Sequence, residues 1–203
     1  MLKIALSKRN FEEIRDAIGR VLVSELNNQK NTLKNDFIPS DLIVYGEAIS
    51  LDVEELPAIN IVWAQSDEIS QQTAFETEFD HKFLIELYTK TQNVVPQLPE
   101  QQHSSWNLAK LAGICYSILM DNEYRHLDFE DKSLIKNRSC KSMVRTQPRI
   151  TKDAENVASG LLEIHYISSE ITQLGEGVLE TNLSTVVKIS DTEKGYKYEI
   201  QSE

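Results

Sequence analysis

Apolar and polar residues alternate most regularly in the segment EFDHKFLIELYTK, residues 78–90. Every second position from Phe79 to Leu87 is apolar except His81, and the positions between them are mostly polar. A repeat of two residues places alternate side chains on opposite faces of a β-strand. The pattern therefore predicts a long strand with one buried face, and its length and regularity favour a central place in a sheet.

Apolar residues that recur every three or four residues predict two helices. In residues 8–30, Asn10 and Glu13 fit a capping box at the start of an amphipathic helix. The stripe of this helix consists of Phe11, Ile14, Ile18, Leu22 and Leu26. In residues 105–121 apolar side chains cover most of the circumference. This second helix is expected to be buried on both sides, between the sheet and a neighbour such as another subunit.

Four further segments have the composition of strands: residues 42–47, 57–63, 140–150 and 157–168. The last two are expected to pair antiparallel around the polar turn 151–156. Residues 64–77, AQSDEISQQTAFET, are polar and are expected to form a long loop before the predicted strand 78–90.

The two strands of the expected pair 140–150 and 157–168 do not match in phase. Val144 and Ile150 mark one face of the first strand, and Lys141, Arg145 and Arg149 mark the other. The apolar face of the second strand consists of Leu162, Ile164 and Tyr166. Joining the two apolar faces requires an odd number of loop residues or a β-bulge, and Pro148 favours an edge position or a bulge.

The order of these elements is helix, three strands, helix and two strands. It predicts an α+β domain over residues 1–169, with two helices packed on one face of a mostly antiparallel sheet. Residues 170–203 are expected to form a C-terminal arm with a small hairpin around DTEKG. This arm has too few apolar residues to fold alone, so it should lie on the body, lie on a partner or be mobile.

Composition describes a globular protein of 203 residues with a net charge of −11. No apolar run approaches the roughly 20 residues that span a bilayer, so no membrane partner is expected. MLKIALSKRN lacks the apolar core and cleavage site of a signal peptide. Cys115 and Cys140 form no CxxC pair, and Cys115 is expected to be a buried, inert thiol. These features favour folding in a reducing cytoplasm.

Positive charge is concentrated in residues 132–152, which contain seven basic residues and no acidic one. Lys141, Arg145 and Arg149 recur every four residues and are expected to share one side of a strand. One interpretation is a solvated edge whose charge discourages aggregation. The other is a band that faces acid, either the acidic surface of a neighbouring subunit in a ring or the phosphates of passing DNA.

The four histidines offer little for a catalytic site. None lies in HExxH, neither cysteine has a catalytic signature, and no glycine-rich phosphate loop or GxSxG is present. We therefore predict a protein that is not an enzyme, with no catalytic, cofactor-binding or metal-binding residues. The alternative is a small cytoplasmic enzyme or ligand-binding domain with a pocket around His81, His165 and Glu163.

The order of motifs resembles that of the tail terminator (tail-completion) proteins of long-tailed bacteriophages and prophages. The resemblance covers residues 8–168 and includes ELPAINIVWA, the long alternating strand, the Ala-containing helix NLAKLAGICYSIL and the hairpin that ends in GLLEIHY. It is a likeness of layout and apolar pattern. Small head–tail connector and neck proteins share much of this layout.

The resemblance implies a ring, expected to be a hexamer, that caps the tail tube in the virion, ends its polymerisation and provides the surface for head docking. The protein would be made in the host cytoplasm. Its implied partners are other copies of itself, the tail tube protein, a neck or head-completion protein, and DNA in the lumen. Contacts with the tube or with neighbours would involve residues 64–77, with Asp67 and Glu68, and residues 151–156, with Lys152 and Asp153. The basic strand with Lys141, Arg145 and Arg149 would face a neighbour or line the lumen.

Overall fold

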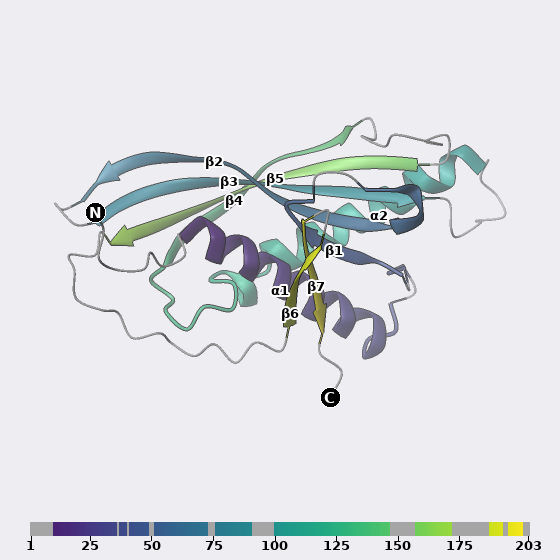
Figure 1. Ribbon diagram of the computed structural model, residues 1–203, viewed down its shortest axis with the longest axis horizontal. Coiled ribbons are helices and arrows are strands. Elements are labelled where there is room, and N and C mark those ends of the chain that lie inside the picture. The colour runs from purple at the N-terminus through teal and green to yellow at the C-terminus, as the bar shows by residue number, and fades with distance from the viewer. Residues whose placement is uncertain are drawn as a thin grey trace.

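The computed structural model describes residues 10–35, 37–39, 41–48, 51–72, 76–90, 100–146, 157–171, 187–192 and 195–200. Its elements are α1 (Asn10–Asn31), β1 (Ile43–Gly46), the short helix η1 (Val53–Glu55), β2 (Ala58–Gln71), β3 (Glu76–Lys90), α2 (Glu100–Met120), the short helix η2 (Asn122–Tyr124), β4 (Ile135–Thr146), β5 (Val157–Ile171), β6 (Val187–Thr192) and β7 (Gly195–Ile200). The long strands form one layer and the two long helices lie beneath it (Figure 1).

The seven described strands form one sheet in the order β4-β5-β3-β2-β1-β7-β6. Among the described pairs only β1 and β2 run parallel, and the other five pairs are antiparallel. Both helices pack on the same face of the sheet and share one apolar core with it. The prediction of an α+β fold, with the order α-β-β-β-α-β-β, is therefore confirmed.

The strand β3 lies inside the sheet, between β2 and β5, as its alternation predicts. Phe83, Ile85 and Leu87 are fully buried on the face that the helices cover. The residues of the predicted apolar row of β5, Leu162, Ile164 and Tyr166, lie on the same face and are fully buried as well. A period of two therefore identified the core side of both strands.

The helix α1 buries the stripe that its period predicts, including Ile14, Ile18, Leu22 and Leu26. The prediction for α2 is only partly right. This helix begins at Glu100, ahead of the predicted start, and it exposes the face that carries Ala109, Lys110, Gly113 and Tyr116. This face is exposed in the single chain, so its burial against another subunit stays a prediction. Because that face carries small or polar-tipped side chains, leaving it in water costs little.

The predicted loop 64–77 is wrong, because most of it is strand. β2 continues to Gln71 and β3 begins at Glu76, and the two pair through residues 65–71. Residues 67–69, 71 and 72 are exposed, so this end of the hairpin contributes no buried apolar face that a periodic pattern could reveal. Main-chain hydrogen bonds hold it, and two bulges in β2 shift its phase.

A second, smaller core lies on the sheet face opposite the helices. It consists of Tyr45, Leu51, Leu56, Ala58, Tyr88 and Val157. The chain between β1 and β2, including η1, covers this end of the sheet. Next to β1, the C-terminal strands β6 and β7 form the predicted hairpin, and β7 pairs antiparallel with β1. The hairpin therefore lies on the body of the protein.

The strand β4 pairs with β5 as predicted, but it begins already at Ile135. The required bulge is present between Cys140 and Ser142. Val144 does not join the apolar face, because it pairs with Leu161 on the opposite side and is 46% exposed. Pro148, Arg149 and Ile150 lie outside the described residues, as do the turn 151–156 and its Lys152 and Asp153.

Candidate functional site

The sheet separates the two histidines that were considered for a pocket. His81 pairs with Tyr166 and lies on the helix-covered face, whereas His165 pairs with Lys82 and lies on the opposite face, hereafter the open face. The structure therefore does not bring His81 together with His165 and Glu163. The signal for this separation is present in the sequence, because His81 belongs to the apolar row of its strand and His165 lies between the apolar residues of its own.

His81 is held in a buried chain of hydrogen bonds. Its Nδ1 lies 2.6 Å from the Ser66 hydroxyl and its Nε2 lies 2.9 Å from the Ser168 hydroxyl. The indole of Trp63 donates to Ser66, and the Asn10 side chain donates to the Ser168 hydroxyl. Burial lowers the pKa of His81, which is only 1% exposed. A neutral imidazole that is hydrogen-bonded at both nitrogens joins β2, β3 and β5.

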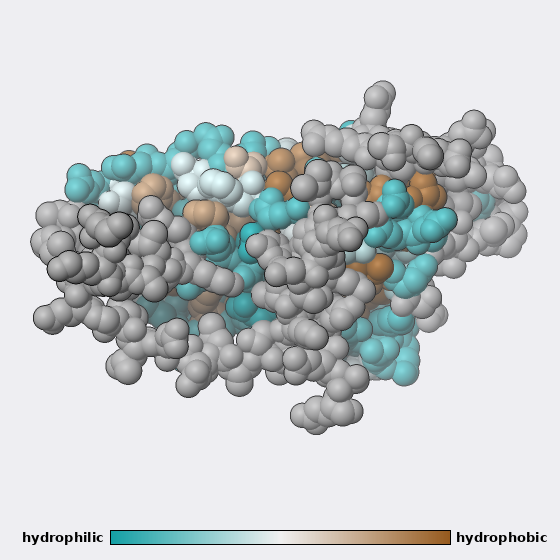
Figure 2. Space-filling model, viewed as in Figure 1, coloured by the Kyte–Doolittle hydropathy of each residue, from teal (hydrophilic) through white to brown (hydrophobic). Residues whose placement is uncertain are grey.

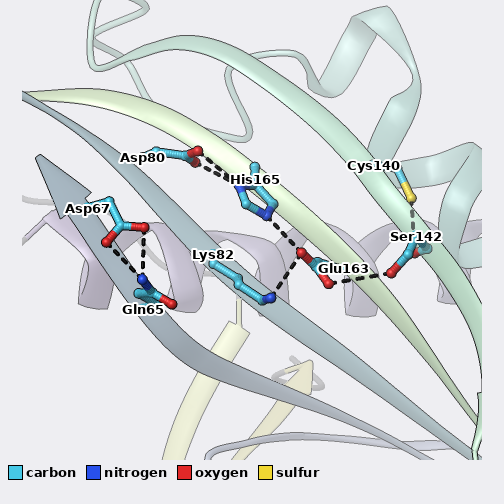
Figure 3. A network of polar contacts seen from close by, with 8 residues as sticks. All are labelled: Gln65, Asp67, Asp80, Lys82, Cys140, Ser142, Glu163 and His165. Atoms are coloured by element: carbon cyan, nitrogen blue, oxygen red, sulfur yellow. Dashed lines mark hydrogen bonds and ion pairs between the residues drawn. The ribbon is translucent and has the colours of Figure 1, made fainter. Parts of the chain in front are cut away.

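On the open face, four ionisable side chains of β3 and β5 form a polar network (Figure 3). Lys82 Nζ lies 2.9 Å from Glu163 Oε1. His165 places Nδ1 2.9 Å from Asp80 Oδ2 and Nε2 3.1 Å from Glu163 Oε1. The hydrogen bonds from Lys82 and His165 lower the pKa of Glu163. Because each imidazole nitrogen faces a carboxylate, neither offers a free lone pair to a substrate or a metal ion.

Metal and thiol chemistry find little support in the part of the chain that the structure describes. No group of three or more His, Cys, Asp and Glu side chains there is placed to hold a metal ion. Cys115 is fully buried, and burial raises its pKa to about 12. Burial also raises the pKa of Cys140. A thiol becomes a nucleophile as its thiolate, so both cysteines are poorly suited to that role at neutral pH.

The cations of β4 fall into two groups. At the start of the strand, Lys136 lies 2.6 Å from a Glu78 carboxylate oxygen, and Arg138 donates to the Asp121 main-chain carbonyl. Further along, Lys141 and Arg145 are exposed. No described acidic residue forms an ion pair with either of them. The register shift between Cys140 and Ser142 falls at Lys141, and from Ser142 to Arg145 the pairing with β5 is continuous. The third predicted member of the band, Arg149, lies outside the described residues.

Acidic residues mark a different border of the sheet. Asp67 and Glu68 are exposed near the end of β2. Asp67 accepts hydrogen bonds from the Gln65 amide at 2.8 and 2.9 Å, and no described cation pairs with Asp67 or Glu68. Hydrophilic side chains gather at this projecting end of the sheet, at upper left in Figure 2. Lys152 and Asp153, the other predicted contact residues, lie outside the described part of the chain.

Both charged borders are free sheet edges among the described strands. β4 ends the strand order, so its side away from β5 has no described neighbour. β1 pairs with β2 only from Ala58 to Ile61, and the Trp63 main-chain N–H donates to the Glu47 carboxylate. Residues 64–71 of β2 therefore have no described strand on that side. The sequence did not reveal the second edge, because residues 64–77 have no apolar period. A free edge presents unpaired main-chain donors and acceptors to any strand that approaches it.

Comparisons with known proteins do not assign a family: no protein-family model matches the chain, and no curated protein is significantly similar to it. Neither described helix is long and apolar enough to cross a membrane.

Proposed function

We propose that the chain is a structural protein of a long-tailed phage or prophage, a tail terminator that assembles into a ring. In this role the ring caps the tail tube, ends its polymerisation and provides the surface on which the head docks. The layout that suggested this family, with two helices on one face of a mostly antiparallel sheet, is the observed fold. Fold alone does not imply function, so the proposal needs a site as well.

The observation that carries the proposal is the pair of free sheet edges with opposite charge. Lys141 and Arg145 lie on the β4 edge, and Asp67 and Glu68 lie near the free segment of β2. A ring built from one kind of subunit needs two different, complementary surfaces on each copy. This chain has such surfaces in a protein whose net charge is −11. The partners under this proposal are neighbouring copies, the tail tube protein, a neck or head-completion protein, and DNA that passes through the lumen.

Tube assembly with purified components tests this proposal. The tail tube protein of the same phage is polymerised with and without this chain, and the products are imaged by negative-stain electron microscopy. We expect each tube to carry a hexameric ring at one end. Tube growth should stop once the ring has bound. Tubes that grow to the same length with the chain present, and that carry no ring, would refute the function.

A further inference from the structure

The two free edges of the sheet fit each other. We propose that the β4 edge of one copy binds the free segment of β2, residues 64–71, of the next copy, so that Arg145 of one chain lies on the same sheet face as Glu68 of another, with Lys141 and Asp67 along the same pair of edges. The occupant of each edge is thus a second copy of this chain. The inference rests on the self-association in the proposed function, and it does not depend on the tail as the place where the chain assembles.

The first support is apolar surface at both edges. Met143 and Val144 on β4 are 49% and 46% exposed, and Ile69 on β2 is 51% exposed. They are three of the six large apolar residues exposed in the described part of the chain. Solvated edge strands usually carry charge and little apolar surface. A contact between the edges would cover part of this apolar surface.

The second support is the pattern of ion pairs across the sheet. Elsewhere in the sheet several charges are matched within the chain, as for Lys82 with Glu163 and for Lys136, at the start of β4, with Glu78. At the two edges they are not, since neither Lys141 and Arg145 nor Asp67 and Glu68 have an ion-pair partner among the described residues. The unmatched charges are positive at one edge and negative at the other. Each edge therefore repels its own copy on a second chain and attracts the other edge, which selects a head-to-tail contact over a symmetric one.

The third support is strand direction. β2, β3, β5 and β4 are consecutive in the sheet, and each runs antiparallel to the next. β4 consequently runs opposite to β2 within one chain. When a second copy with the same orientation is placed beside the first, its β4 lies antiparallel to β2 of the neighbour. The contact thus continues the alternating sheet from one subunit to the next, with the main-chain hydrogen bonds of an antiparallel pair.

The register shows that neighbouring copies must be offset along the strands. Within one chain Arg145 is level with Gly160 of β5, then Leu87 of β3 and then Ile59 of β2, where β1 already occupies the edge. Asp67 lies nearer the other end of β2. Pairing these charges therefore shifts each copy along the strand direction relative to the last. Such a stagger is normal between the tilted strands of a closed sheet.

Charge reversal in two complementary variants tests the contact. The first variant carries Lys141→Glu and Arg145→Glu, which makes both edges acidic, and the second carries Asp67→Lys and Glu68→Lys, which makes both edges basic. We expect the wild-type chain to assemble with rising concentration in analytical ultracentrifugation. Each variant alone should dissociate with a dissociation constant about a hundredfold higher, because like charges then meet. An equimolar mixture should assemble again, since acidic and basic edges alternate around it.

The control reverses two charges on the exposed connection before β4, Glu130→Lys with Lys132→Glu, and should assemble as the wild type does. Circular dichroism confirms that each variant is folded. The inference is overturned if the wild type stays monomeric, if the single variants assemble normally, or if the folded mixture fails to assemble. If the mixture assembles but does not cap tubes, the edge contact stands and the tail function fails. If the separate variants still cap tubes, the function stands and the edge contact fails.

Discussion

His81 lies on the helix-covered face of β3, where both of its ring nitrogens are within hydrogen-bond distance of serine hydroxyls. A neutral ring that donates at one nitrogen and accepts at the other satisfies both hydroxyls. Burial lowers its pKa below the ordinary value of 6.5. At this position the imidazole links three strands through hydrogen bonds. Its protonation should make the free energy of unfolding depend on pH.

We expect the free energy of unfolding to fall as the pH drops below 6.5, the ordinary pKa of the histidine in the unfolded chain. In that window the unfolded state binds a proton that the folded state excludes, so acid favours unfolding; above it the residue contributes no slope. The slope from one such group is at most about 1.4 kcal/mol per pH unit. His81→Gln should remove this part of the slope, as measured by urea unfolding at a series of pH values.

The matched control is His126→Gln. His126 is half-buried, and its Nδ1 lies 3.1 Å from the Ile135 carbonyl oxygen. This variant should keep the dependence seen in the wild type. An unchanged slope in His81→Gln would contradict the assignment of a buried neutral ring.

Among the elements, α2 and β5 meet at a point where the strand has no side chain. A Cβ placed on Gly160 would lie 3.3 Å from the Leu108 side chain of α2 and 3.3 Å from the Val144 carbonyl oxygen of β4. Leu108 can shift, but the carbonyl belongs to the paired strand. The glycine therefore lets α2 approach the sheet closely.

Replacing Gly160 with alanine should lower the free energy of unfolding by about 1–3 kcal/mol, the usual cost of overpacking. Gly113→Ala on the same helix is the matched comparison, because nothing lies within 4 Å of its Cβ. In a helix interior alanine is favoured over glycine by about 1 kcal/mol, so this variant should be more stable than the wild type. Urea unfolding should show a lower free energy of unfolding for Gly160→Ala and a higher one for Gly113→Ala. Changes in the same direction in both variants would contradict the described packing.

At the scale of the whole molecule, the excess of negative charge opposes association while the edges favour it. The net charge of −11 repels any two copies, and only the cations near the β4 edge offset this repulsion locally. Salt screens both the general repulsion between copies and the attraction between the edges, and it screens charges that are far apart across solvent most strongly. The edge charges would lie in direct contact, partly shielded from water, whereas most of the general repulsion acts across solvent.

Raising the ionic strength from about 0.1 M to about 1 M should therefore first strengthen assembly, as the general repulsion is screened, and then weaken it as the edge ion pairs are screened too. Sedimentation at fixed protein concentration across this range measures the effect. The charge-reversed variants of either edge should show only the strengthening branch. A wild-type profile identical to theirs would indicate that the edge ion pairs contribute nothing to association.

Much of the fold could be predicted because its core leaves a periodic trace in the sequence. The row from Phe83 to Leu87 and the stripe from Ile14 to Leu26 both gave the buried side correctly. The loop prediction for residues 64–77 failed because that end of the hairpin is held by main-chain hydrogen bonds and buries little apolar surface. For α2 the apolar count did not distinguish the face that packs on the sheet from the face that the single chain leaves exposed.

The sequence by itself determined the apolar rows that form the core beneath the helices, the approximate order of helices and strands, and the concentration of positive charge in residues 132–152. These are local properties, set by period, propensity and charge. Only the tertiary structure decided that β1 stops short along β2, that Lys136 and Arg138 are engaged within the chain, and that Lys141 and Arg145 remain at a free edge. Strand order and register depend on contacts between segments far apart in the chain, and no single segment encodes them.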